Sequence, residues 1–441
     1  MKKKILLNVI PISRMLVSSV LVSSVLVTST LSGFAQTNFF RPTDQELRLN
    51  YIKSINYTLG ARAEYGSRSS GKSWDDKRAN VLALQDPKQS AIDMIIKPVG
   101  DIPDSLKLVR AQLLVHERGE PTETRGQQLF TGDFTELDVT LFGSYKFPFD
   151  IPGKLAINAY LPIVYKKVDG FKMTDLTLNS KDTGIGKDNL TKELLTKNLK
   201  TLVKEWGNLD LSNWDQTGVG DLVVTLNWSD VYKPEKNDAF KYKLIFNVYA
   251  GVSCPTGKEK DEDKALSMPL GYGDGAWGIP FGLGLWAKFP HHIQVGVNGD
   301  FMYLFDKTRI RRLLSYSEQT EFLLLNKGNA TKSYGFTWQF NPFIGLHHFW
   351  KGLSAKVAYQ YVGHDDDELS PKDSNFNYVT VNYANNLKEW SSHNMIFSAS
   401  YDFLTEFKSI TPQVQLFYKL PVDGKNVIDM HTFGGQLVVN F

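Results

Sequence analysis

Apolar and polar residues alternate along most of the 441-residue chain. In residues 57–65 the odd positions carry Tyr, Leu, Ala, Ala and Tyr, and the even positions carry Thr, Gly, Arg and Glu. Because successive side chains of a strand point to opposite faces, this pattern predicts a strand with one lipid-facing side and one side turned to a lumen. Twelve segments repeat it, at residues 57–65, 137–147, 155–165, 222–228, 242–254, 277–289, 293–305, 334–346, 353–361, 395–403, 412–420 and 433–441.

The connections between these segments alternate in length. A barrel with both termini in the periplasm has long outer loops and short inner turns, whereas a soluble β-sandwich has no reason to sort its loops this way. We therefore expect an all-β fold, a transmembrane antiparallel up-and-down β-barrel of about 12 strands, or 14 if residues 106–116 add a hairpin rather than a plug. The long loops are residues 66–133, 168–217, 255–276, 306–333 and 363–391, and the short turns are 148–153, 229–239, 290–292, 347–352 and 404–410, with a brief last outer loop at 423–425.

The last segment ends on the aromatic residue Phe441. Phe433, Gly435, Leu437 and Val439 share its face of the predicted strand. A terminal aromatic strand of this kind resembles the sorting signal that the outer-membrane barrel-assembly machinery recognises. A strand that only closes the barrel against the first strand would show the same pattern.

The N-terminus has the features of an export signal. Three lysines follow Met1, residues 5–31 are largely apolar, and the small residues Gly33 and Ala35 predict cleavage before Gln36. Arg14 and repeated serine pairs interrupt the apolar stretch, so an uncleaved membrane helix of roughly 20 apolar residues is the less favoured alternative. We expect a signal peptide at 1–35, a periplasmic segment at 36–55 and a barrel at 56–441 in the outer membrane of a Gram-negative-type bacterium.

Composition narrows the class further. Hydrophobic residues make up 42% of the chain and aromatic residues 12%, yet no apolar run after the signal approaches the length of a membrane helix. Without the four basic residues of the signal, 46 lysines and arginines stand against 47 acidic residues, so the chain lacks the basic footprint of a nucleic-acid-binding protein. The single cysteine, Cys254, cannot form an internal disulfide.

Three short motifs lie in order in the middle of the chain: TGVGDL at 217–222, VSCPTGK at 252–258 and PLGYGDG at 269–275. They resemble landmarks of an outer-membrane family labelled for the MetA pathway of phenol degradation, over roughly residues 134–300. The resemblance implies a transporter-like barrel related in outline to channels for hydrophobic compounds. The long first and second outer loops depart from that pattern, so no substrate is inherited from it. The residues that carry the resemblance are Gly218, Gly220, Asp221, Pro255, Thr256, Gly257, Gly271 and Gly273.

Strand phase predicts which residues line the lumen, and the lining determines what a pore passes. Charged residues at this density form either a network of paired charges that fills a narrow barrel or a polar path for a small solute. Aromatic residues also fall on the inward phase, where they either contact a solute or fill space: Phe142, Tyr160, Tyr249, Trp286, Phe343 and Phe417. The lumen-lining candidates are Arg62, Glu64, Glu136, Asp138, Lys146, Lys243, Trp286, Lys288, Asp300, Lys356 and Lys419, together with Asp402.

Prolines at 162, 280, 342 and 412 interrupt predicted strands. Each removes one donor from the hydrogen-bond ladder, which predicts bulges or local openings there. One such opening could serve as a lateral exit into the membrane.

Residues 189–206 in the second outer loop have leucines and Trp206 at helical spacing and lysines elsewhere. The pattern predicts an amphipathic helix, capped by Asp188 or Asn189. Such a helix would cover the barrel mouth, lie on the membrane surface, or simply pack against neighbouring loops.

Other chemistry in the sequence is weaker. Ser391, Ser392 and His393 contain the residue types of a hydrolase, but neighbours along a strand point to opposite faces. The run at 364–368, HDDDE, offers hard oxygen ligands for calcium without the spacing of a known calcium loop. The histidine pairs at 291–292 and 347–348 could meet at one rim of the barrel. We predict no catalytic residue, metal site or cofactor.

The expected function is therefore an outer-membrane channel or transporter for small solutes with hydrophobic or aromatic character. A barrel for surface display or adhesion through its long loops is the first alternative, and a lipid-acting enzyme is the second. The expected partners are outer-membrane lipid, the barrel-assembly machinery and a small-molecule solute, with no nucleic acid.

Overall fold

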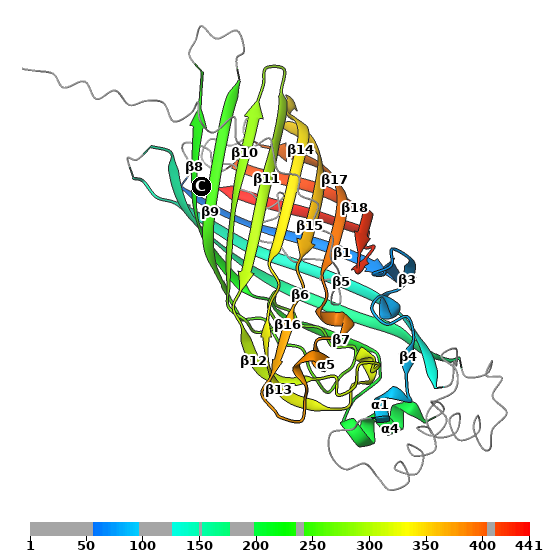
Figure 1. Cartoon of the computed structure of the whole chain (residues 1–441). Helices are drawn as coiled ribbons and strands as arrows, with labels where there is room; N and C mark the ends of the chain where they lie inside the picture. The colour runs from blue at the N-terminus through cyan, green and yellow to red at the C-terminus, as the bar shows by residue number, and fades with distance from the viewer. Residues whose placement is uncertain (1–55, 97–125, 150–151, 177–197, 235–241, 404–410) are drawn as a thin grey trace, which may run out of the picture.

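A computed structural model describes residues 56–96, 126–149, 152–176, 198–234, 242–403 and 411–441. Within these residues, twelve antiparallel strands form a closed barrel, in which the first strand pairs with the last (Figure 1). The predicted signal peptide, the periplasmic segment and residues 106–116 lie outside the described residues. The barrel strands are β1 (Tyr57–Arg68), β5 (Gln127–Lys146), β6 (Lys154–Asp175), β8 (Leu222–Tyr232), β9 (Lys243–Cys254), β10 (Gly278–Lys288), β11 (Ile293–Leu304), β14 (Thr337–Trp350), β15 (Leu353–His364), β17 (Trp390–Asp402), β18 (Thr411–Lys425) and β20 (Thr432–Asn440).

These strands confirm the predicted fold class and all twelve predicted segments. The largest difference concerns β5 and β6, which are 20 and 22 residues long and begin or end well outside the predicted bounds. Their extra residues pair with each other at the end of the barrel that carries the long loops, from Gln128↔Asp175 to Phe134↔Val168. There one strand face packs on loop residues instead of lipid, so the lipid-imposed pattern used to find the strands is missing.

The outer face of the barrel is apolar. Leu59, Leu226, Leu283, Ile344 and Leu416 are 49–65% exposed. Exposed aliphatic side chains at this density are costly in water and are favourable against lipid, as in a transmembrane barrel. Aromatic side chains occupy both margins of this face, namely Tyr57, Phe149 and Trp350 at the end with short turns and Tyr65, Trp277 and Tyr303 towards the end with long loops. No described helix has the length and apolar content needed to cross a membrane.

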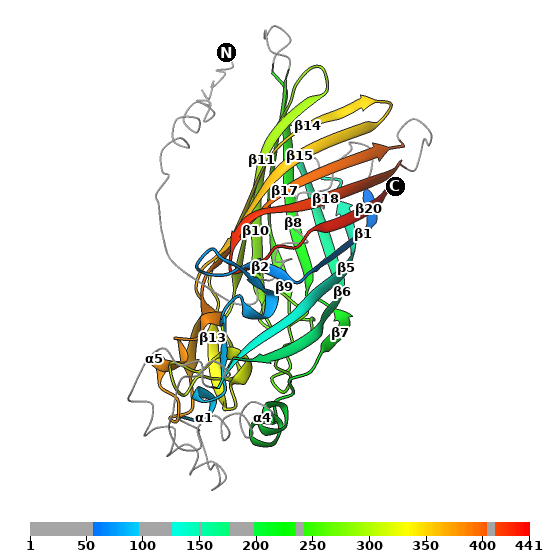
Figure 2. The ribbon, with the colours of Figure 1, turned by 90° about the vertical axis from the view of Figure 1, so that its right-hand side faces the viewer.

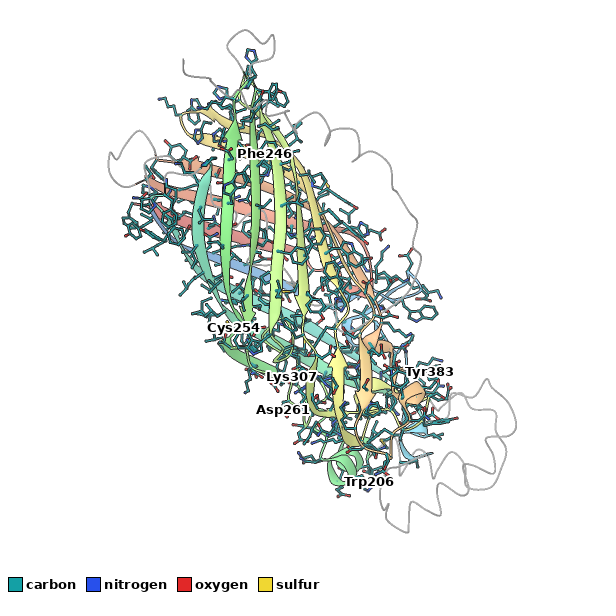
Figure 3. All side chains as sticks on the ribbon, turned by 60° about the vertical axis from the view of Figure 1, so that its left-hand side comes forward. Trp206, Phe246, Cys254, Asp261, Lys307 and Tyr383 are labelled. Carbon is teal, nitrogen blue, oxygen red and sulfur yellow. The ribbon has the colours of Figure 1, made fainter. Side chains whose placement is uncertain are left out.

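The described parts of the long loops fold together into a cap at one end of the barrel (Figure 2). One three-stranded sheet of the cap contains β12 (Lys307–Arg312), β13 (Lys327–Ser333) and β16 (Glu368–Pro371), and a second contains β2 (Ser70–Lys72), β3 (Arg78–Asn80) and β19 (Val427–Ile428). Short elements complete it: β4 (Gln89–Ser90), β7 (Trp214–Val219), α1 (Asp93–Ile96), α4 (Leu199–Gly207), α5 (Tyr378–Val381) and the 3-10 helices η4 (Val81–Ala83), η7 (Glu321–Leu323) and η8 (Asn385–Leu387). In Figure 3, Trp206 and Tyr383 mark this cap, and Phe246 marks β9 near the opposite end.

The described part of the predicted amphipathic helix is α4. Leu199 and Val203 are fully buried in the main apolar cluster of the cap, and Leu202 and Trp206 pack against it. The described part of the apolar stripe therefore packs against neighbouring loops, which is the third of the predicted roles. Residues 188–197, with the predicted capping positions, lie outside the described residues.

Candidate functional site

The side chains of the predicted lumen residues point into the barrel interior. In each strand the buried positions alternate with the lipid-facing ones, so a buried charged side chain in a barrel strand points inward. Lys243, at the turn end of β9, is exposed, and Trp286, Lys288, Lys356 and Asp402 are partly buried. The remaining charged candidates are 0–7% exposed: Arg62, Glu64, Glu136, Asp138, Lys146, Asp300 and Lys419.

One group of these residues forms a network of paired charges on β1 and β18. Glu64 is ion-paired with Arg62 and, at 3.2 Å, with Lys419. The Arg62 guanidinium also lies 4.6 Å from the centre of the Phe417 ring. Because both cations have a carboxylate partner, this part of the interior matches the predicted space-filling network.

Asp300 is held by neutral donors. The Tyr249 hydroxyl donates to it at 2.9 Å, and the side-chain amides of Gln339 and Asn341 lie at 3.2 and 3.4 Å. Three polar hydrogen-bonding groups thus surround a carboxylate that is completely buried. Hydrogen bonds from these neutral donors stabilise the charged form of the carboxylate.

A pocket of about 90 Å³ lies in the interior at the turn end of the barrel. Two lysines, Lys288 and Lys356, and two aromatic residues, Trp286 and Phe343, line it together with His347. The remaining wall contains one carboxylate, one alanine and otherwise polar, uncharged residues: Gln294, Ser354, Ala355, Ser398, Ser400, Asp402, Gln413, Gln415 and Gln436. The sequence pattern identified its lysines and aromatic residues. It placed His347 at the barrel rim rather than in the lumen lining, and it missed the glutamines, because polar uncharged residues are common on any inward face.

The predicted meeting of the two histidine pairs is partly observed at this end. His292 Nδ1 lies 2.9 Å from the backbone oxygen of His347, and His348 Nε2 is hydrogen-bonded to the Asp402 carboxylate. The His347 and His348 rings stack with centroids 3.9 Å apart. The rings thus contact different groups, and among the described residues no set of three metal-ligating side chains converges.

The serines at 391 and 392 do not form a hydrolase site with His393. His393 Nδ1 is bonded to the Tyr359 hydroxyl, and the Ser392 hydroxyl oxygen accepts a hydrogen bond from Asn394 at 3.0 Å. Within the described contacts neither serine is bonded to the histidine, so the hydroxyl lacks the base that a nucleophile needs.

The family-motif residues converge on a break in the barrel wall. β6 pairs first with β8, up to Tyr160↔Val223, and then with β7, from Ile163↔Val219. Between them, the Gly220 amide donates to the backbone oxygen of Pro162 at 2.8 Å. On its other side, β8 pairs with β9 as far as Leu222↔Cys254. By contrast, among the described residues no strand pairs with the edge of β7 that faces away from β6.

Asp221 is the centre of this junction. It is 1% exposed, and its carboxylate accepts hydrogen bonds from the backbone amides of Gly257 at 2.9 Å and Tyr272 at 2.6 Å. A Cβ on Gly271 would lie 2.3 Å from that carboxylate, so only glycine fits there. Thr256 completes the junction, because its hydroxyl donates to the Gly220 oxygen at 2.8 Å and accepts from the Leu222 amide at 2.9 Å.

Three motifs that are separated in sequence thus form one structural clamp, which we call the wall junction: residues 218–222, 255–257 and 271–273. A Cβ on Gly218 would lie 2.9 Å from Leu270, and one on Gly273 would lie 3.0 Å from Ala276. The sequence identified these residues by resemblance, but their common centre is apparent only in the folded chain.

The prolines behave differently from the prediction of bulges. Register shifts in the barrel lie elsewhere, within residues 131–133, 346–350 and 393–394. At Pro280 the pairing between β10 and β9 is interrupted, and at Pro342 the pairing between β14 and β15 is interrupted, but in both cases the strands resume pairing in the same register. Pro412 lies at the start of β18 and pairs with Val439 of β20. Proline removes a donor, but the flanking pairs keep the strands aligned. Only Pro162 coincides with an opening, the wall junction.

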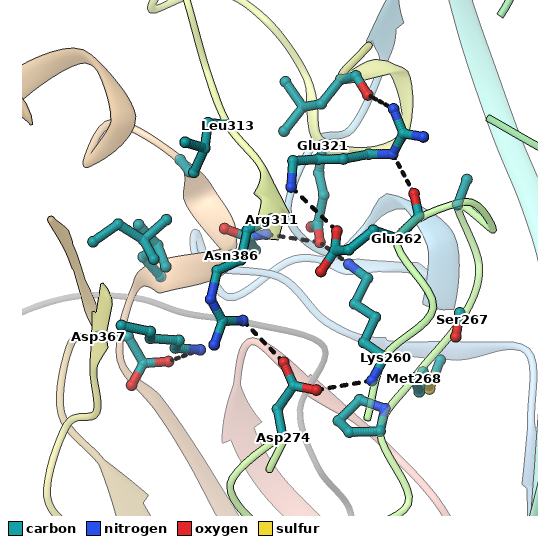
Figure 4. Close-up of a pocket in the computed structure, with 18 of the residues that line it drawn as sticks. Lys260, Glu262, Ser267, Met268, Asp274, Arg311, Leu313, Glu321, Asp367 and Asn386 are labelled. Carbon is teal, nitrogen blue, oxygen red and sulfur yellow. Dashed lines mark hydrogen bonds and ion pairs between the residues drawn. The ribbon is translucent and has the colours of Figure 1, made fainter. Parts of the chain in front are cut away.

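A second cavity, of about 170 Å³, lies between the barrel and the cap (Figure 4). Asp274 pairs with Arg309 at 2.7 Å and Arg311 at 2.9 Å, and its other oxygen accepts from the Lys260 amide. Arg309 also pairs with Glu262 at 2.6 Å. The basic run at 307–312 was not recognised from the sequence as part of a site, and its charges are neutralised by the loop at 259–274.

The acidic run at 364–368 contributes to this cavity through Asp367 rather than forming a calcium site. Burial opposes ionisation of Asp367, yet Lys332 at 2.6 Å and His364 at 3.2 Å hold its pKa well below the usual range. Because two basic groups occupy its oxygens and Asp366 accepts the Glu389 amide instead, the run presents no convergent set of ligands.

Asp86 makes the stability of the cap dependent on pH. It accepts hydrogen bonds from the Glu321 amide at 2.8 Å and the Asn385 side chain at 2.7 Å. Burial, which these bonds only partly offset, raises the pKa of Asp86 from 3.8 to about 6. Between these two pKa values, the folded cap keeps a proton that the unfolded chain releases. The stabilisation of the folded cap by this proton is therefore complete below about pH 4 and is lost as the pH rises through about 6.

Hydrogen exchange of the backbone amides of residues 321–324, corrected for intrinsic exchange rates, gives the free energy of opening of this part of the cap. We expect that free energy to fall by up to about 3 kcal/mol between pH 4 and pH 7. In Asp86→Asn the group does not titrate, so this pH dependence should disappear. Persistence of the full dependence in the variant would assign it to other groups.

Comparison with known proteins supports the fold. No family model matches the chain, and no curated protein sequence matches it. Among solved structures, the "COG4313 outer membrane channel" from Pseudomonas putida F1 matches over 89% of this chain and 100% of its own, with a TM-score of 0.50 and 11% identity. The transport unit of the autotransporter AIDA-I from Escherichia coli matches over 91% and 95%, with a TM-score of 0.34 and 8% identity. The first likeness shows a shared barrel fold, and the second is too weak to carry an argument.

Proposed function

We propose that this protein is an outer-membrane channel for small solutes that carry an apolar or aromatic part. The observation that supports this most directly is the inner wall, where lysines and aromatic side chains line one pocket inside a closed barrel with an apolar outer face. A solute with both a polar and an apolar part can contact both kinds of side chain. The similar solved structure is itself described as an outer membrane channel.

This proposal includes the export and assembly steps predicted from the sequence. The N-terminal 35 residues would direct export and be removed, and the strand that ends at Phe441 would be recognised by the barrel-assembly machinery. The cap would then face the cell exterior, and the turn end would face the periplasm. The resemblance to the phenol-degradation family agrees with this proposal but adds no substrate.

The wall junction supports a lateral route between the barrel interior and the membrane. The edge of β7 that faces away from β6 has no partner strand among the described residues, and the loop at 255–277 packs over the face of β7 beside it, where Leu270 meets Gly218. A wall closed by a loop can open at a lower cost than one closed by a continuous ladder, since fewer backbone hydrogen bonds must break.

A reversible crosslink across this junction tests the route. Gly218→Cys and Leu270→Cys, in a Cys254→Ser background, would be joined by a short bifunctional thiol reagent that a reductant can cleave. In cells with an intact outer membrane, we expect the wild-type barrel to accelerate uptake of a neutral hydrophobic dye, and the crosslink to reduce that acceleration at least about fivefold until it is cleaved.

The control is the same treatment of the Cys254→Ser parent, which should leave uptake unchanged. If the intact barrel gives no more dye uptake than cells without it, and no conductance in planar bilayers, the channel proposal fails and surface display becomes the better explanation. If uptake is normal with the crosslink in place, the channel stands and the lateral route is wrong.

A further inference from the structure

The pocket at the turn end of the barrel differs in charge from the rest of the interior. Near Glu64, each cation has a carboxylate partner. In the pocket, the carboxylate of the lining, Asp402, is hydrogen-bonded to the imidazole of His348. Lys288 therefore differs from the cations near Glu64, because no described carboxylate contacts its ammonium directly.

Lys288 is the cation of the pocket that a bound anion would stabilise most. Its ammonium lies 3.4 Å from His347 Nε2, and among the described residues no carboxylate oxygen lies within 4.0 Å of it. A neutral imidazole nitrogen can accept one of its three hydrogen bonds but cannot neutralise its charge. A partly buried ammonium without a counterion is unfavourable, and a bound carboxylate would stabilise it.

The wall beside the lysines suits an aromatic ring. The Trp286 and Phe343 rings lie in a T-shaped arrangement with centroids 6.4 Å apart, and Trp286 is held by a hydrogen bond of 2.9 Å from its indole nitrogen to Asn298. Lys356 lies 5.8 Å from the centre of the Phe343 ring, so the cationic and aromatic surfaces meet. A ligand there would bring its charge to the lysines and its ring to the aromatic pair.

From this arrangement we propose that the pocket binds a small aromatic monocarboxylate, with Lys288 and Lys356 holding the carboxylate and Trp286 and Phe343 contacting the ring. The volume of about 90 Å³ admits a carboxylate and the adjoining ring edge, and the pocket is only partly enclosed. The inference deepens the proposed channel function by naming a class of solute, and it rests on that function for its biological meaning. The binding itself can be tested without transport.

Calorimetric titration of the full-length purified barrel, in a nonionic detergent, tests the site with benzoate, benzyl alcohol, acetate and inorganic phosphate. We expect benzoate to bind at least roughly tenfold more tightly than the other three, because only benzoate offers both a carboxylate and a ring. Lys288→Met should weaken benzoate binding at least roughly tenfold and leave benzyl alcohol unchanged. Phe343→Leu should reduce benzoate binding without creating a preference for acetate.

Lys419→Met is the matched control, since it removes an interior lysine that already pairs with Glu64 at 3.2 Å. Benzoate affinity should be unchanged in this variant. If Lys288→Met does not fold, the benzoate affinity of Lys356→Met tests the role of the pocket lysines instead. A crystal soaked with 4-bromobenzoate should place the bromine anomalous peak beside Trp286.

Equal affinity for benzoate and benzyl alcohol would overturn the inference, because the lysines would then have no role. Binding of acetate or phosphate as tight as that of benzoate would also overturn it, by showing a general anion site without ring recognition. In either case neutral dye uptake by the barrel would still test the channel proposal separately.

Discussion

Asp221→Ala is expected to lower the free energy of unfolding by roughly 2–5 kcal/mol. Two backbone amides, from Gly257 and Tyr272, donate to the buried carboxylate, and each unpaired buried donor costs about 1–3 kcal/mol. Removing a buried charge recovers part of its desolvation cost, which keeps the estimate below the largest sum. The measurement is urea unfolding of the barrel in lipid vesicles, followed by tryptophan fluorescence.

Asp215→Ala is the matched control for this variant. Asp215 lies on β7, close to the wall junction, but its side chain is exposed, so its removal should change stability by less than about 0.5 kcal/mol. Asp221→Asn should fall between the two, since an amide oxygen can accept one of the two hydrogen bonds. A loss no larger for Asp221→Ala than for Asp215→Ala would mean that the junction does not depend on its carboxylate.

Leu437→Lys is expected to destabilise the membrane-inserted barrel by about 2–4 kcal/mol. Leu437 is 49% exposed and lies in the middle of β20, opposite Ala61 on one side and Val414 on the other. Phe433 and Phe441 lie on the same strand face, four residues to either side, so this position lies near the middle of the apolar band. A lysine there would meet lipid rather than water.

Val379→Lys in the cap separates a membrane effect from a general effect of lysine. Val379 is 59% exposed on α5, outside the barrel, and its replacement should cost less than about 0.5 kcal/mol. Unfolding of both variants should be measured in the same vesicles. Equal costs would show that the face containing Leu437 does not contact lipid.

The strand phase of residues such as Leu59, Arg62 and Leu437 could be predicted from the sequence alone. A barrel strand between lipid and lumen must alternate, and this requirement acts on each residue and its next neighbour only. The number of strands followed from counting such segments. The same local argument failed where the bilayer does not act, as in the extensions of β5 and β6 and at the prolines, whose ladders kept their register.

The partners of inward-facing groups were decided only by the tertiary structure. Strand phase places Lys288 and Lys419 on the same side of their strands, yet Lys419 lies beside Glu64 while Lys288 faces a pocket with aromatic walls. Likewise, the motifs at 217–222, 252–258 and 269–275 could be recognised one by one, but Asp221 joins them only when loops of differing length return to the same break in the wall. Periodicity specifies the face of each strand because it is local. Barrel closure and loop return bring together residues far apart in sequence, so they determine which charges are paired and which remain available to a ligand.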